Sequence, residues 1–143
     1  MGYGERTIWA QSISSIVCSI VYFAIIIPQL GTSRVDQIDW IAPMLWTILA
    51  SIILSIALNI VAGIIVGMRD RESAGTSDQR DREIGWFGDR VGQAFLVIGG
   101  VGALALTMLG ADYFWIGNTL FLGFALSMLL GSVTRIIAYR RGF

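Results

Sequence analysis

Hydrophobic residues fill four long stretches of the chain, and polar or charged residues separate these stretches. They cover residues 8–30, 41–67, 91–110 and 114–134. Because a helix needs about 20 apolar residues to cross the hydrocarbon core of a bilayer, each stretch is long enough for one span. The pattern predicts an all-α integral membrane protein. Residues 1–143 should form a single membrane domain built as a four-transmembrane-helix bundle.

The central segment, residues 68–90, is the longest polar interruption in this pattern. It holds five of the ten arginines and six of the ten acidic residues. Within it, the alternating charges of residues 78–83 place opposite charges three or four positions apart, which supports a helix. A capping box at residues 76–79 marks the expected start of that helix. The helix then joins the third span, either continuously or through an elbow at Gly85 or Gly88.

The distribution of arginines predicts the orientation of the spans. Cytoplasmic loops of membrane proteins carry an excess of positive residues. With the central segment in the cytoplasm, nine arginines lie on that side of the bilayer and Arg34 alone lies on the other. We therefore expect a multi-pass protein of the cell (inner) membrane with both termini in the cytoplasm.

Composition narrows the chemistry that the chain can perform. It has no His, Cys18 is its only cysteine, and no carboxylate lies within a span. Histidine, the commonest metal ligand and general base, is therefore missing. Arginines interleaved with Asp78, Asp81 and Glu83 disfavour a metal site at these carboxylates. We expect no catalytic residues, no metal and no cofactor. The formal net charge is zero, so we expect no nucleic-acid partner.

One face of the first span is polar. At 100° per residue, seven polar or small side chains fall within about a third of the helix circumference: Gln11, Ser12, Ser15, Cys18, Ser19, Tyr22 and Gln29. Asn59 in the second span and Asn118 in the fourth are the other candidates for the same polar seam. Polar groups facing lipid are costly. The seam should therefore face protein, as hydrogen bonds between helices, or water, as the lining of a solute path.

Small residues recur on one face of the third and fourth spans, where they would let helix backbones approach closely. In the third span and just before it they are Gly85, Gly88, Gly92, Gly99, Ala103 and Gly110. In the fourth span they are Gly123, Ser127 and Gly131. The ribbon predicts helix packing, either within the bundle or between copies. We expect a homo-oligomer, with a dimer favoured.

The two halves of the chain share short matches that suggest two duplicated helical hairpins. Gly-Glu-Arg at residues 4–6 corresponds to Gly-Asp-Arg at residues 88–90. Trp-Ile-Ala at residues 40–42 corresponds to Trp-Ile-Gly at residues 115–117. Such a duplication would relate the hairpins by an axis along the membrane normal.

Residues 78–84, Asp-Gln-Arg-Asp-Arg-Glu-Ile, are followed by Gly-Asp-Arg-Val-Gly at residues 88–92. This stretch resembles a group of small prokaryotic four-span membrane proteins that carry an Asp-x-Arg-Asp-x-x-Ile motif before the third span. The resemblance implies a membrane protein and hints at a regulatory role, because some members are encoded near transcription regulators. It implies no established activity.

Two functions from different classes fit these observations. The first is a regulatory or accessory protein that lies in the lipid bilayer and docks a membrane or cytosolic protein through its charged segment. Its candidate docking residues are Asp78, Arg80, Asp81, Arg82, Glu83 and Arg90. The alternative is a homo-oligomeric channel or passive transporter for small solutes, lined by the polar seam of the first span.

Overall fold

The computed structural model describes residues 3–69 and 79–142, and it confirms an all-α fold with four long helices. Each helix is long and apolar enough to cross a membrane, so the chain is a multi-pass membrane protein. The helices are α1 Tyr3–Leu30, α2 Ile41–Arg69, α3 Gln79–Met108 and α4 Tyr113–Arg141, with a short 3-10 helix, η1 Val35–Gln37, between the first two.

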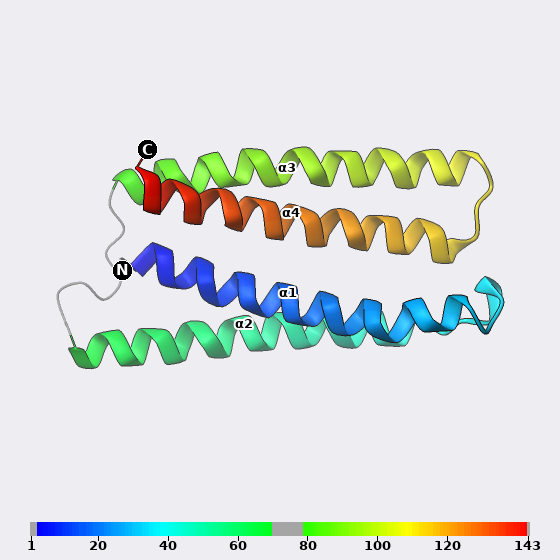
Figure 1. The fold of residues 1–143 in the computed structure, drawn as a ribbon, viewed down its shortest axis with the longest axis horizontal. Helices are drawn as coiled ribbons and strands as arrows, with labels where there is room; N and C mark the ends of the chain where they lie inside the picture. Colours follow the sequence, from blue (N-terminus) through cyan, green and yellow to red (C-terminus); the bar gives the residue numbers. More distant parts are fainter. Residues whose placement is uncertain (1–2, 70–78, 143) are drawn as a thin grey trace.

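The helices lie side by side in the order α3, α4, α1, α2 (Figure 1). Neighbours in sequence form the hairpins α1–α2 and α3–α4, and the hairpins meet where α1 packs against α4. Helices α2 and α3 therefore form the two outer edges. The structure thus contains the two expected hairpins, whereas their origin by duplication stays a prediction.

Helix α3 begins about three turns earlier than the predicted third span. It runs without interruption from Gln79 through Gly85 and Gly88, so the central segment contains no elbow in its described part. Helix α2 also continues to Arg69. The predicted cap at Thr76 lies outside the described residues. As a result, the charged residues from position 79 onward stand on a continuous helix rather than in a loop.

Close approach of α3 and α4 explains the glycine ribbon. A Cβ atom added at Gly99 would lie 2.7 Å from the Cα atom of Gly123, and one added at Gly92 would lie 2.8 Å from the carbonyl oxygen of Ser127. A Cβ atom at Gly131 would lie 3.0 Å from the carbonyl oxygen of Gly88. Only glycine fits such backbone contacts. The ribbon is therefore used within the bundle, and Ala103 is buried on it.

Two glycines assigned to this ribbon by periodicity do not belong to it. No atom lies within 4 Å of a Cβ atom added at Gly85. Gly110 has a φ angle of +71° and follows the end of α3, where its N–H group donates to the carbonyl of Thr107. Its role is to terminate the helix, because the left-handed conformation favours glycine.

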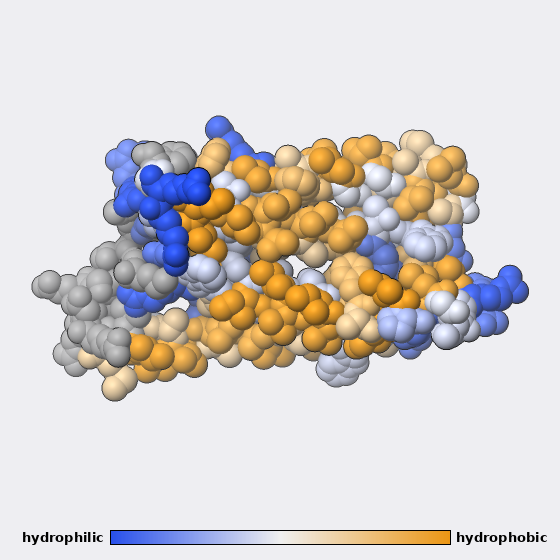
Figure 2. Space-filling model, viewed as in Figure 1, coloured by the Kyte–Doolittle hydropathy of each residue, from blue (hydrophilic) through white to orange (hydrophobic). Residues whose placement is uncertain are grey.

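A buried hydrophobic cluster joins α1, α4 and the connection between α1 and α2. It consists of Tyr22, Ile26, Ile38 and Phe114. Trp40 packs beside this cluster and covers Gly117, where an added Cβ atom would lie 2.6 Å from the indole ring. This cluster holds the hairpins together at the end opposite the two termini. On the face shown in Figure 2, a broad hydrophobic band covers the middle of the helices, and hydrophilic residues gather toward the two ends, as expected for a protein that crosses a membrane.

Candidate functional site

The charged end of the molecule, where α3 begins and α4 ends, carries hydrogen bonds between these two helices. The hydroxyl of Tyr139 donates to the carboxylate of Asp81 over 2.5 Å. The guanidinium of Arg80 donates to the backbone carbonyl of Tyr139 over 3.4 Å. The partners are nearly sixty positions apart in sequence. They fix the first turn of α3 on the last turns of α4.

An ion pair between Arg135 of α4 and Asp89 of α3 lies about two turns further into the bundle. The side chain of Arg135 is only 19% exposed, whereas that of Asp89 is 67% exposed. The pair joins α4 to the central segment. Among the described residues, the Nε atom of Arg135 is buried without a hydrogen-bond partner. Beside it lies a cavity of about 70 Å³ that Gln11 and Ser132 help to line.

The opposite side of the same turns of α3 is exposed. Arg82, Trp86 and Arg90 follow one another at four-residue intervals and are all exposed. Residues at this spacing lie along one side of a helix. Glu83 accepts a hydrogen bond from the side-chain amide of Gln79 over 3.0 Å, within α3 itself. We call Arg82, Trp86 and Arg90 the exposed α3 surface.

The six predicted docking residues therefore separate into different environments. Arg80 and Asp81 contact α4 within the chain, and Arg82 and Arg90 remain on the exposed α3 surface. Asp78 lies outside the described residues. In the described ranges, no group of three His, Cys, Asp or Glu side chains is placed to hold a metal ion.

Most of the predicted polar seam is engaged in hydrogen bonds. Tyr22 donates to the side-chain carbonyl of Asn118 over 2.5 Å, which links α1 to α4 as the packing interpretation predicts. Ser12 and Gln29 donate to carbonyls one turn earlier on their own helix. The amide of Asn59 donates to the carbonyl of Ser55 on the same helix, and Asn59 forms no hydrogen bond to a described residue of another helix.

Sequence reasoning missed Ser14, the fully buried serine of α1. Its hydroxyl donates to the backbone carbonyl of Ser51 over 2.9 Å and so links α1 to α2. Ser14 lies just outside the polar stripe. A row of small residues at four-residue spacing, Ala10, Ser14 and Cys18, was the available signal for this second face.

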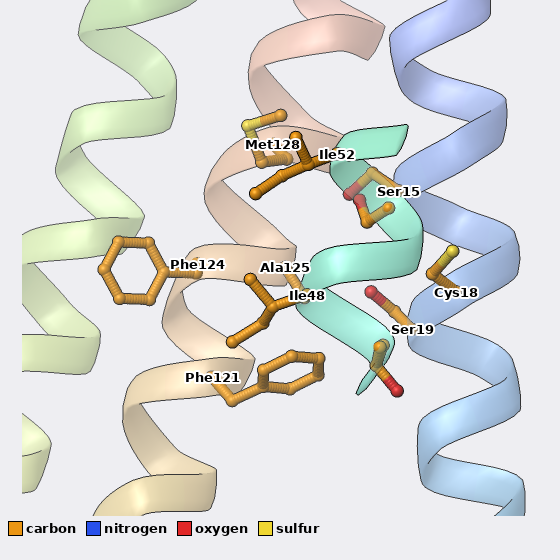
Figure 3. Close-up of a pocket in the computed structure, with 11 residues that line it drawn as sticks. Ser15, Cys18, Ser19, Ile48, Ile52, Phe121, Phe124, Ala125 and Met128 are labelled. Carbon is orange, nitrogen blue, oxygen red and sulfur yellow. The ribbon is translucent and has the colours of Figure 1, made fainter. Parts of the chain in front are cut away.

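Ser15 and Ser19 instead face a cavity of about 420 Å³ between α1, α2 and α4 (Figure 3). Helix α2 contributes Ile48 and Ile52 together with two hydroxyl residues, and α4 contributes apolar side chains. The α2 hydroxyl residues are Thr47 and Ser51, and the α4 side chains include Phe121, Ala125 and Met128. The lining is largely apolar, with the Ser15 and Ser19 hydroxyls and the Cys18 thiol on the α1 side. The sequence indicated the α1 side of this cavity but not the residues of α2 and α4 that complete it.

The chain was compared with protein-family models, curated proteins and solved structures, and it matches none of them. The chain is therefore assigned to the multi-pass membrane proteins from the length and composition of its four helices.

Proposed function

We propose that this protein is a small, non-enzymatic regulatory or accessory protein of the cell membrane, which docks a protein partner through the exposed α3 surface. The observation that carries the proposal is the two-sided arrangement of the first turns of α3. One side is fastened to α4 by Asp81, Arg80 and Asp89. The other side presents Arg82, Trp86 and Arg90 to the surroundings.

This arrangement suits binding because the presenting helix is already ordered. A surface held by contacts to a second helix loses less conformational entropy on association than a free loop does. Arginine and tryptophan are also the side chains most often found at the energetic centre of protein interfaces. Trp86 is 67% exposed, so it can bury a large aromatic area when a partner covers it.

The charge of the exposed α3 surface indicates the kind of partner. Arg82 and Arg90 bring two positive charges to this side, and an acidic segment would be the electrostatic complement. Following the arginine distribution, we place this end of the bundle and both termini in the cytoplasm. The partner is then a cytosolic protein, or the cytosolic part of another membrane protein.

The test compares charge removal at the two ends of the molecule. Arg82→Gln combined with Arg90→Gln should release the partner from particles extracted in lipid discs, while the four helices stay inserted. Arg34→Gln is the matched control, since its side chain is 81% exposed and lies at the opposite end. Quantitative mass spectrometry of each particle would measure the retained partner. Equal retention in the double variant and the control would refute the docking proposal.

A further inference from the structure

The cavity between α1, α2 and α4 is not used by the docking proposal, and its chemistry is distinct from that of the charged end. We infer that it is a binding site for a neutral, membrane-soluble molecule that has an apolar body and one hydroxyl or carbonyl group. The inference is independent of the proposed function, because the cavity shares no residue with the exposed α3 surface.

The size and lining of the cavity fit a small molecule. Its volume of about 420 Å³ lies within the range of about 300–1,000 Å³ that is typical of ligand sites. Phe121, Ile48 and Ile52 supply apolar contact. Such sites combine an apolar wall with a few polar groups that orient the ligand. Here hydroxyl groups come from α1 and, through Thr47 and Ser51, from α2, and the Thr47 hydroxyl already donates to a backbone carbonyl one turn earlier on α2.

The hydroxyls of Ser15 and Ser19 are the orienting groups. They stand one helical turn apart and both face the cavity (Figure 3). The nearby serines Ser12 and Ser14 are satisfied by backbone carbonyls, whereas Ser15 and Ser19 make no hydrogen bond to another described residue. A hydroxyl facing hydrocarbon without a partner is unfavourable. A ligand hydroxyl or carbonyl would supply the missing partner.

The length of the cavity argues against a transmembrane helix as its occupant. Along α4 it extends from Phe121 to Met128, a rise of about 10 Å. A helix that crosses the bilayer spans about 30 Å of hydrocarbon, so it would extend well beyond this cavity. The position of Ser15 and Ser19 in the middle of α1 places the site within the hydrocarbon layer, so the ligand reaches it through the bilayer. A charged ligand is excluded for the same reason.

The experiment uses a medium-chain primary alcohol carrying a photoreactive diazirine, added to the full-length protein in lipid discs. Light-induced labelling should be saturable and should map to Phe121, Ala125 or Met128. The unlabelled alcohol should compete with it about three- to tenfold better than the alkane of the same length, because the alkane lacks the hydroxyl. Equal competition by alcohol and alkane would overturn the inference in favour of unspecific filling by lipid chains.

Two variants test the roles of the lining. Removing both hydroxyls with Ser15→Ala and Ser19→Ala should weaken competition by the alcohol about three- to tenfold, as expected for lost hydrogen bonds. Filling the cavity with Ser19→Phe should abolish the saturable labelling. Ile20→Phe is the matched control, since Ile20 is adjacent and 62% exposed, and labelling should persist there. Unchanged labelling in Ser19→Phe, or cross-linking to another polypeptide in place of the alcohol, would contradict the assignment.

Discussion

Adding one methyl group at Gly99 should separate α3 from α4, whereas the same change at the next residue, Gly100, should not. An alanine Cβ at position 99 would lie 2.7 Å from the Cα atom of Gly123, and ordinary contact begins at 3.4 Å. The difference, 3.4 minus 2.7, means that the helices must move apart by at least about 0.7 Å. At Gly100 nothing lies within 4 Å of the added atom.

The free-energy difference between the two variants follows from packing alone. Both substitutions gain the same helix propensity, about 1 kcal/mol in favour of alanine, so this gain cancels in the comparison. Overpacking a close contact costs about 1–3 kcal/mol. A gap of 0.5–1 Å elsewhere along the interface would also forfeit about a quarter to a half of each dispersion contact there. Gly99→Ala should therefore be about 1–3 kcal/mol less stable than Gly100→Ala.

Reversible unfolding in bicelles, measured by steric trapping or by tryptophan fluorescence in mixed micelles, would give both free energies. The reciprocal variant Gly123→Ala should behave like Gly99→Ala, because its Cβ would lie 2.9 Å from the Cα atom of Gly99. Combining the two should cost less than the sum of the single effects, since the first substitution already separates the helices. Equal stability of Gly99→Ala and Gly100→Ala would refute the close packing of α3 on α4.

Two further predictions concern the charged end, and both use the same unfolding assay. Tyr139→Phe should lower the free energy of unfolding by about 1 kcal/mol, because it removes the hydrogen bond to Asp81; a stability equal to that of the wild type would show that this bond contributes nothing. Asp89→Asn should cost about 1–2 kcal/mol, a value between those of exposed and buried ion pairs, since Arg135 loses its anionic partner. A stabilising effect of Asp89→Asn would contradict the pairing.

The spans and much of the α3–α4 interface could be predicted from the sequence, because both depend on local periodicity. Long apolar runs require helices in a bilayer, and glycines at helical spacing indicate close backbone approach. Periodicity does not show where an interface ends. The prediction from periodicity therefore assigned two glycines to the α3–α4 interface that lie outside it. Gly85 faces no neighbouring helix, and Gly110 terminates α3.

The charged end and the cavity could be predicted only in part, because both depend on which helices are neighbours. The bond between Tyr139 and Asp81 joins residues 58 positions apart, and periodicity within one helix cannot pair them. Similarly, the polar stripe of α1 indicated Ser15 and Ser19, but the cavity exists only because α2 and α4 flank α1. The helix order α3, α4, α1, α2 supplies this missing information.

The composition of the native particle tests the docking proposal most directly. The particle would be extracted in lipid discs without detergent, and its mass and protein content measured. We expect one or two copies of this chain bound to a different polypeptide. That polypeptide should be lost from the Arg82→Gln, Arg90→Gln variant and retained by Arg34→Gln. A particle that contains several copies of this chain and no other protein would contradict the docking proposal and would favour the channel alternative.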